Sequence, residues 1–461
     1  MSFEDEQYQA ALDYLYSFID YSLTKNFKNA ADKFDLNRVI QFLETFDNPH
    51  NKYPVIHVAG TKGKGSTGAM IASVLMEAGY QVGFYTSPHL QEYTERIKIN
   101  GKEIPRDRLV EIVELMKPEV AQIKILTTFE LTTALGFIYF AQENIDFGVI
   151  EVGLGGRLDA TNVVDPLVSV ITSLSLDHMQ ILGDTLDKIA FEKGGIIKPK
   201  RPIVTSAQQL IAYQVLGKLA AGRGAPLINA NDRYSVESIE HSLERQVFRI
   251  HGVDIDPIEL QMPLLGAHQL ENAVTAFAAL QVVKSCGYPI EDEAIRTGFE
   301  RVSWPARFEV LSHNPRIIVD SAHNRDSAKK LHKAINEYLP NIPIVMVFGA
   351  SDDKDVSGML EELSPGVESI IMTQSTHPRS RGAAQLAELG RQKHIHCEET
   401  ATIEDAVDKA LSIAGSEAAI VITGSIFVAA GAREYLLKRP NLCLHTNQSL
   451  IHPLIRRQDG K

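Results

Sequence analysis

The apolar residues of the first 50 positions recur at spacings of three and four, which predicts two amphipathic helices. Leu12, Leu15 and Ile19 mark the first helix. The second is marked by Leu36, Val39, Ile40, Leu43 and Phe46. Further along, the pattern changes to short apolar runs separated by helical segments. That alternation is typical of a parallel sheet with helices on both faces.

Two such α/β series follow one another, with a break at Ser303-Trp-Pro-Ala306, where the proline disfavours helix at the residue before it. In the first series we predict strands at 53–60, 81–86, 146–151, 167–174 and 202–206, and helices at 67–78, 129–142 and 269–284. In the second we predict strands at 316–320, 342–348, 369–373 and 418–423, and a helix at 327–338. We therefore expect domains at 1–300 and 301–440, with a loose tail at 441–461.

Length and composition narrow the class of protein. A chain of 461 residues corresponds to two or three domains at about 100–200 residues each. Its formal charge of −12 disfavours a protein that coats nucleic acid or an anionic membrane, so we expect neither partner. The three cysteines lie far apart, which fits a reducing compartment.

The targeting signals of secreted or membrane proteins are missing from the pattern. The N-terminus lacks a basic segment followed by an apolar one, so it does not resemble a secretory signal. The longest uncharged apolar stretch, Ala418 to Ala432, has 15 residues, whereas a spanning helix needs about 20. It reads better as a strand, a turn and the start of a helix. We expect a cytoplasmic protein.

The strongest chemical signal is the segment Gly60-Thr-Lys-Gly-Lys-Gly-Ser-Thr67, which lies between a predicted strand and a predicted helix. Glycines let backbone N–H groups surround a phosphate, and the helix N-terminus adds a positive dipole end. Lys64 can reach the terminal phosphates, and Ser66 or Thr67 can bind Mg²⁺. The match to GxxxxGK[ST] is not strict, because Gly65 separates the lysine from the hydroxyl residue.

Two other interpretations of this segment are less favoured. A plain surface loop would not need a strand before it and a helix after it. The glycines also spell GxGxxG (Gly63, Gly65, Gly68), a dinucleotide fingerprint, but that motif needs an acidic residue at the end of the next strand. The sequence there is Gly83-Phe-Tyr-Thr86, which contains no acid.

Three further clusters follow apolar strands or helices. Glu151 ends a predicted strand, where ligands bind in open parallel sheets, and His178 follows another. Alone, each is more often a structural or solvated residue. Together with Ser66 they can converge on one cleft and hold a metal ion. By composition alone, Lys193 and its neighbour Glu192 form an ordinary solvated ion pair. HExxH, CxxC and GxSxG are all missing from the sequence, which argues against a dedicated zinc enzyme or a serine hydrolase.

Taken together, the segments resemble the Mur ligase superfamily, specifically folylpolyglutamate synthase/dihydrofolate synthase, from about Tyr53 to about Tyr435. The order and spacing of the segments are what make the resemblance specific. They are HVAGTKGKGST (57–67), TSPHL (86–90), YTERI (93–97), TTFELTTALGF (127–137), EVGLGGRLDATN (151–162), LDHMQILGDTLDKIAFEKGGIIK (176–198), GAHQLENAVTA (266–276), WPARFE (304–309), VDSAHNRDS (319–327) and GSIFVAAGAREYL (424–436).

The resemblance implies an N-terminal P-loop-type ATP-binding domain with a mostly parallel sheet, followed by a smaller Rossmann-like C-terminal glutamate-ligase domain. It implies ATP as cofactor, two Mg²⁺ sites, and a monovalent cation such as K⁺ as a further candidate. The nucleotide-binding positions it implies are Gly60, Thr61, Lys62, Gly63, Lys64, Gly65, Ser66, Thr67, Asn272, Arg307 and Asp320. The metal ligands it implies are Ser66, Glu151, His178 and Lys193, the last as a carbamate.

The resemblance also assigns the acceptor side and the catalytic residues. It places the folate side at Ser87, Pro88, His89, Phe129 and Asp159, and the glutamate side at His323 and Ser425. The catalytic residues it implies are Lys64, Lys193, His323 and Asp320. The chain departs from the family pattern at Lys62, where many bacterial relatives have Asn, at Ser321 and Arg325, and at Gly194 after Lys193.

The leading hypothesis is an ATP-dependent ligase that acts through an acyl phosphate, with L-glutamate and a folate or dihydropteroate as substrates, and we expect it to be a monomer. A muropeptide ligase is the alternative within the superfamily, but only 59 residues precede Gly60, too few for the extra domain of about 100–150 residues. A P-loop module that signals through partners, and a hydride-transfer enzyme, are the alternatives from other classes.

Overall fold

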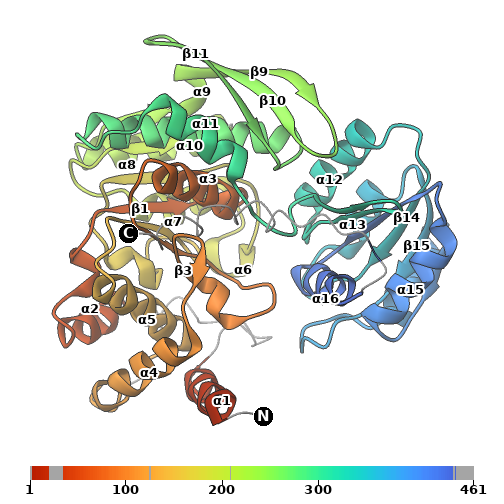
Figure 1. Ribbon diagram of the computed structural model, residues 1–461, viewed down its shortest axis with the longest axis horizontal. Coiled ribbons are helices and arrows are strands. Elements are labelled where there is room, and N and C mark those ends of the chain that lie inside the picture. Colours follow the sequence, from red (N-terminus) through yellow and green to blue (C-terminus); the bar gives the residue numbers. More distant parts are fainter. Residues whose placement is uncertain (1–2, 20–34, 124–125, 208, 440–441, 443–461) are drawn as a thin grey trace, which may run out of the picture. The chain divides into compact units, whose positions relative to one another are not determined.

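The computed structural model describes residues 3–19, 35–123, 126–207, 209–439 and 442. These form two compact units (Figure 1). Unit 1 holds the described residues up to Glu237 together with Arg249–Leu260 and Leu270–Phe299. Unit 2 holds Ser238–Phe248, Gln261–Gln269 and the described residues from Glu300 on.

Unit 1 is built on an eight-stranded sheet with strand order β4-β3-β2-β5-β1-β6-β7-β8. Strands β2, β5, β1, β6, β7 and β8 run parallel, while β3 and β4 are added antiparallel at one edge. Strands β1, β5, β6 and β7 are buried along their whole length, because helices cover both faces of a parallel sheet. The bounds are β1 Val55–Ala59, β2 Val82–Tyr85, β3 Ile97–Ile99, β4 Lys102–Glu103, β5 Phe147–Glu151, β6 Val168–Ile171, β7 Ile203–Thr205 and β8 Leu227–Asn229.

The helices of unit 1 confirm the predicted amphipathic segments and add several that the pattern did not predict. Helix α3 packs on β1, β2 and β5, and helix α1 packs on α4 and α5. Ile19 lies beyond the end of α1, and Ile40 is partly exposed, so neither belongs to the buried stripes. The bounds are α1 Phe3–Tyr16, α2 Leu36–Glu44, α3 Lys64–Glu77, α4 Arg106–Val120, α5 Thr128–Gln142, α6 Met179–Leu182, α7 Leu186–Lys193, α8 Leu210–Gly222, α9 Ala230–Arg233, α10 Ala267–Ser285 and α11 Asp292–Arg301.

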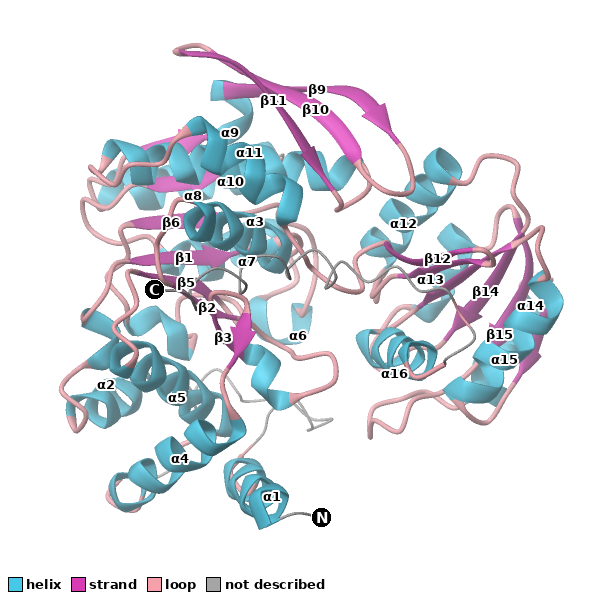
Figure 2. Cartoon of the chain, in the orientation of Figure 1, coloured by secondary structure: helices cyan, strands magenta, loops and turns pink. Residues whose placement is uncertain are grey.

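A separate three-stranded sheet, order β11-β10-β9, was not predicted (Figure 2). Its strands are β9 Tyr234–His241, β10 Gln246–Gly252 and β11 Ile255–Met262. Most of β9 is exposed and polar, so it lacks the apolar run by which the other strands were found. The same stretch explains why the two units do not divide the chain at a single residue: Ser238–Phe248 and Gln261–Gln269 associate with unit 2.

Unit 2 is built on a six-stranded sheet with strand order β12-β13-β17-β14-β15-β16. All neighbours are parallel except β12, which runs antiparallel to β13. The bounds are β12 Glu309–His313, β13 Arg316–Val319, β14 Ile344–Phe348, β15 Val367–Met372, β16 Cys397–Glu399 and β17 Ala419–Thr423, with α12 Arg325–Tyr338, α13 Val356–Leu363, α14 Ala383–Gln392, α15 Ile403–Ala414 and α16 Ile426–Leu437. The predicted tail at 441–461 lies outside the described residues apart from one position.

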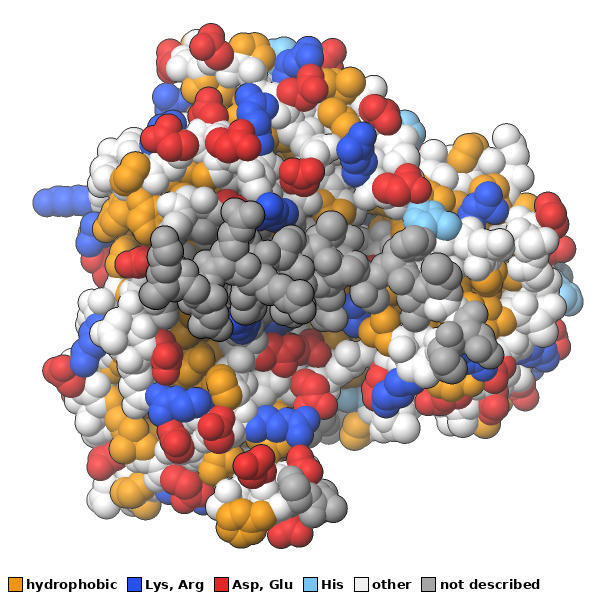
Figure 3. Space-filling view, in the orientation of Figure 1, with side chains coloured by type: hydrophobic (Ala, Val, Ile, Leu, Met, Phe, Trp, Pro, Cys, Tyr) orange, Lys and Arg blue, Asp and Glu red, His pale blue; other side chains and the backbone are white. Residues whose placement is uncertain are grey.

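The described surface carries mixed charge, and acidic and basic side chains are interspersed over the visible face (Figure 3). Within the described residues, every helix is too short or too polar to cross a bilayer. The α/β class and the sheet predicted for each half of the chain are confirmed.

Candidate active site

The glycine-rich loop joins β1 to α3 at the carboxyl edge of the sheet. Gly63 caps the helix in a left-handed conformation with φ +86°, and α3 begins at Lys64, three residues earlier than predicted. The first helical hydrogen bond runs from the Thr67 N–H to the Gly63 carbonyl. The N–H groups of Lys64, Gly65 and Ser66 therefore have no partner within the helix. Such a turn is suited to an anion.

Hydrogen bonds fix the glycine loop to the loop that follows β6. The Thr61 N–H donates to the Ser173 carbonyl (2.9 Å), and the Thr61 hydroxyl donates to the Ser175 carbonyl (3.1 Å). The Thr172 hydroxyl donates to the Lys62 carbonyl (2.7 Å). These contacts hold the loop in shape before any ligand arrives.

Gly63 also leaves room for Asn272, which α10 brings to the loop. A Cβ atom built on Gly63 would lie 2.2 Å from Asn272 Oδ1. Two predicted nucleotide-binding positions, 209 residues apart in sequence (272 − 63), are thus neighbours in unit 1. Only the tertiary structure reveals this contact.

Gly63→Ala should weaken nucleotide binding by about tenfold, because a left-handed alanine costs roughly 1–2 kcal/mol and its methyl group displaces Asn272. Gly79→Ala is the matched control: Gly79 lies just past the other end of α3, has φ +92°, and has no atom within 4 Å of the added Cβ. Calorimetric titration with ADP checks both variants. Equal affinities for the two variants would contradict the steric role of Gly63.

Lys64 and Glu151 form the charged centre of the site. Lys64 Nζ lies 3.9 Å from Glu151 Oε1, and the two side chains are 18% and 7% exposed. Glu151 ends β5, which pairs with β1, so strand register brings the carboxylate to the loop. Ser66 is buried in the first turn of α3, and the buried Thr67 hydroxyl has no hydrogen-bond partner. The structure therefore brings Lys64 and Glu151 together at the start of α3.

His178 lies in the loop after β6 with φ +48°, and its side chain is 44% exposed. Its neighbour Asp177 accepts a hydrogen bond from Lys62 Nζ (2.9 Å). Asp177 was not singled out in the sequence. The described residues contain no group of three His, Cys, Asp or Glu side chains that would hold a metal ion by themselves. A cation shared by Ser66, Glu151 and His178 stays a prediction.

Lys193 is fully buried, and its Nζ donates to the Gly60 carbonyl (2.9 Å). Burial, aided by the nearby Lys64 charge and opposed by Asp177, lowers its pKa from 10.5 to about 7. The segment is fixed by Arg157, whose Nη2 donates to Glu192 Oε1 (2.9 Å). Lys193 is therefore a buried lysine beside the glycine loop and not a solvated surface residue.

The predicted folate-side residues lie on different elements of unit 1. The Ser87–Pro88 peptide is cis, and Arg96 Nε donates to His89 Nδ1 (2.8 Å). Burial lowers the pKa of His89 to about 4, with the Arg96 charge acting in the same direction. Phe129 lies close to Gly153, where an added Cβ would come within 2.4 Å of its ring.

Asp159 is buried and already hydrogen-bonded within the chain. One carboxylate oxygen accepts from the Leu154 N–H (2.8 Å), and the other accepts from the Thr161 N–H and hydroxyl. Since the Thr161 hydroxyl donates to Asp159, it accepts from His57 Nε2 (2.9 Å). Burial lowers the pKa of His57 to about 3, so the ring is neutral. Neither His57 nor Thr161 was singled out in the sequence.

The remaining predicted residues belong to unit 2, at the carboxyl edge of its sheet. Asp320 follows β13 and Ser425 follows β17, and these strands are parallel neighbours. The Gly424 N–H donates to the Ala322 carbonyl (3.1 Å), which holds the two loops together. Ser425 caps α16 by accepting from the Val428 N–H (3.1 Å). His323 donates its N–H to the Ser327 hydroxyl (3.0 Å) at the start of α12.

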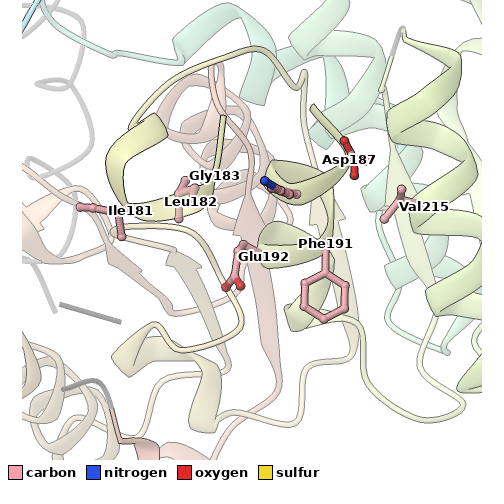
Figure 4. Close-up of a pocket in the computed structure, with 8 residues that line it drawn as sticks. Ile181, Leu182, Gly183, Asp187, Phe191, Glu192 and Val215 are labelled. Carbon is pink, nitrogen blue, oxygen red and sulfur yellow. The ribbon is translucent and has the colours of Figure 1, made fainter. Parts of the chain in front are cut away.

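A cavity of about 480 Å³ lies between α6, α7 and α8 (Figure 4). Glu192 borders it, so it adjoins the segment that carries Lys193. It is lined by Ile181, Leu182, Gly183, Asp187, Lys188, Phe191, Glu192 and Val215, none of which was predicted to bind a ligand.

Comparison with known proteins identifies the family. The Mur ligase middle domain matches residues 58–280, and the Mur ligase glutamate ligase domain matches residues 306–426. Dihydrofolate synthase/folylpolyglutamate synthase of Bacillus subtilis is 36% identical over 408 residues, which cover 87% of this chain and 94% of that protein. The chain belongs to the folylpolyglutamate synthase/dihydrofolate synthase family of Mur ligases.

Solved structures of this family agree with the fold. The Mycobacterium tuberculosis folylpolyglutamate synthase complexed with ADP superposes with a TM-score of 0.85 at 31% identity, covering 95% of this chain and 99% of that one. An Escherichia coli member in complex with DHPP and ADP gives 0.82 at 31% identity, covering 93% and 97%. The family assignment inferred from the motifs is confirmed, and the folate-ligase names of these proteins favour it over the muropeptide alternative.

Proposed function

We propose that this chain is an ATP-dependent ligase that joins L-glutamate to the carboxylate of a folate or of dihydropteroate, and that ADP and phosphate are released. The observation that carries this proposal is the glycine loop leading into α3, with Lys64 beside the strand-end carboxylate of Glu151. The relatives named above support the substrate class, since one was solved with both DHPP and ADP.

The residues of the glycine loop and the first turn of α3 fit the phosphates of a nucleoside triphosphate. The first turn of α3 offers backbone N–H groups, Lys64 offers a cation, and the Thr67 hydroxyl is buried without a partner. Asn272 stands beside Gly63 from the same unit. Arg307 and Asp320, which belong to unit 2, are proposed as further nucleotide contacts.

The donor set also fits Mg²⁺. The Ser66 hydroxyl and the Glu151 carboxylate are hard oxygen ligands, with His178 proposed as a third. Magnesium usually keeps waters and substrate phosphates as its other ligands, so one protein carboxylate is enough. When bound, magnesium and ATP supply a transferable phosphoryl group with part of its charge neutralised.

The reaction must bring two anions together, and the chain's own residues make this feasible. Lys64 lowers the repulsion between the acceptor carboxylate and the phosphates, and it stabilises the charge that develops on the transferring group. Transfer of the terminal phosphoryl group from ATP to the acceptor carboxylate gives an acyl phosphate and ADP. The glutamate amine then attacks the acyl carbon, and phosphate leaves. We propose that His323 and Ser425 receive glutamate, and that Ser87, Pro88, His89, Phe129 and Asp159 form the folate side.

Lys193 is proposed to act as a carbamate that holds a second Mg²⁺. A carbamate forms when an uncharged amine attacks CO₂, and the pKa of Lys193 at about 7 supplies that uncharged amine near neutral pH. The product is an anionic oxygen ligand, which suits a hard metal. We also propose a cytoplasmic monomer, with a monovalent cation such as K⁺ as an additional cofactor.

A phosphate-release assay tests the function directly. Dihydropteroate and tetrahydrofolate are each supplied with ATP and Mg²⁺, with and without glutamate. We expect sustained phosphate release only when both the pteroyl substrate and glutamate are present, and the preferred acceptor shows which ligase activity dominates. Release that ignores both substrates, from folded protein, would refute the ligase and favour a nucleotide-sensing module.

A further inference from the structure

The segment that carries Arg307 has an unusual backbone. Ala306 and Phe308 both have positive φ, at +56° and +49°, and neither is glycine. Both are buried, at 0% and 1% exposure, whereas Arg307 between them is half-buried. Residues with a Cβ atom rarely adopt a left-handed backbone conformation, so other groups must hold Ala306 and Phe308 at these φ angles.

Two carboxylates hold the two strained residues by their N–H groups. Glu309 Oε2 accepts from the Ala306 N–H at 2.9 Å, and Asp320 Oδ2 accepts from the Phe308 N–H at 2.8 Å. The Ser321 N–H adds a hydrogen bond to the Ala306 carbonyl (3.0 Å). The backbone on either side of Arg307 is therefore fixed by one acidic side chain each.

Glu309 is itself held by an arginine 124 residues away in the sequence. Arg433 Nε donates to both carboxylate oxygens of Glu309, at 3.1 and 2.9 Å, and Nη2 donates to Oε1 at 3.0 Å. The Arg433 side chain is 8% exposed and that of Glu309 is 17% exposed. A bidentate arginine–carboxylate pair of this kind fixes the orientation of the carboxylate and also neutralises its charge.

We propose that Glu309 and Arg433 are positioning residues that hold Arg307 in its nucleotide-binding conformation. The inference rests on the proposed function, because Arg307 is a nucleotide contact only under that proposal. Arg433 lies near the far end of α16 from Ser425, which caps the start of the helix, so loss of the pair should leave the loop proposed to receive glutamate in place. Asp320 acts from the opposite side of the same segment.

Glu309→Gln is the sharpest test, because both carboxylate oxygens accept from N–H donors. The amide NH₂ of glutamine must face one of those donors, so the segment loses a hydrogen bond while the side chain keeps its size. We expect the KM for ATP to rise at least tenfold and the KM for glutamate to change less than twofold. Arg433→Gln should raise the KM for ATP in the same way.

Glu398→Gln is the matched control, since it removes the carboxylate from the half-buried Lys409–Glu398 pair, which joins α15 to β16 in the same unit. This variant should leave the KM for ATP and the KM for glutamate unchanged. Arg307→Gln is measured in parallel. An unchanged KM for ATP in that variant would overturn the nucleotide role of Arg307, and with it the purpose of the pair. If Arg307→Gln raises it and Glu309→Gln does not, only the positioning role is overturned.

Glycine substitution separates positioning from simple stability. Glycine adopts φ +56° without a penalty, so Ala306→Gly lessens the need for Glu309. We expect Ala306→Gly, combined with Glu309→Gln, to recover at least half of the lost ATP affinity. A double variant that keeps the raised KM, with a melting temperature as low as that of Glu309→Gln, would overturn the proposal in favour of a purely structural ion pair.

Discussion

Lys64→Ala should lower phosphate release by about 10²–10³-fold, the loss typical when one preorganised group that stabilises transition-state charge is removed. Lys64 Nζ lies 3.9 Å from Glu151 at the head of α3, where the acceptor carboxylate and the phosphates would meet. Without this cation the two anions repel each other, and the charge on the transferring group is less stabilised. Initial rates at saturating ATP, folate and glutamate measure the effect.

Folding must be separated from chemistry in that experiment. Removing Lys64 breaks its ion pair with the buried Glu151, so thermal melts of Lys64→Ala, and of Lys64→Met combined with Glu151→Gln, report on folding. The double variant serves only as a folding control, because Glu151 is the proposed Mg²⁺ ligand. Lys52→Ala is the matched control, because its pair with Asp47 is largely exposed. We expect near wild-type activity from the control. Wild-type rates from folded Lys64→Ala would contradict a catalytic role and favour a non-catalytic nucleotide-binding protein.

Lys193→Met should abolish most ligase activity, because the proposed carbamate cannot form on methionine. The wild-type enzyme should lose activity in buffer stripped of CO₂ and recover it when bicarbonate is added. Carbon-13 NMR after incubation with labelled bicarbonate should show a carbamate resonance that is missing from the variant. Lys188→Met is the control, since Lys188 is an exposed lysine on the same helix. A CO₂-independent wild-type enzyme without that resonance would contradict the carbamate.

The same residue predicts how stability depends on pH. Burial lowers the pKa of Lys193 to about 7 in the folded chain, below its ordinary value of 10.5. Between these values the unfolded chain binds more protons, so Lys193 makes the free energy of unfolding rise as the pH rises from about 7 to about 10. Denaturant melts in CO₂-free buffer should show a shallower rise for Lys193→Met, and a more stable variant at pH 7.5. Parallel pH profiles would contradict this.

The local pattern was enough to predict most of the framework. The apolar runs predicted the buried strands of both sheets, because strands covered on both faces must be apolar throughout. The sheet β9–β11 gave no such signal and was missed, because β9 is mostly exposed and polar, and β10 and β11 alternate buried with exposed positions. The start of α3 was placed three residues late, since Gly63 is both the last loop residue and the helix cap.

The sequence alone determined the two α/β halves, the glycine loop and the chemistry that its residues can support, since these depend on neighbours along the chain. The tertiary structure alone decided which distant groups meet. The strand register places Glu151 beside Lys64. Burial lowers the pKa of Lys193 to about 7, which the sequence alone did not indicate. Helix α16 positions Arg433 to donate to Glu309. Contacts across more than a hundred residues, and the desolvation of a charge, are properties of packing that no local spacing encodes.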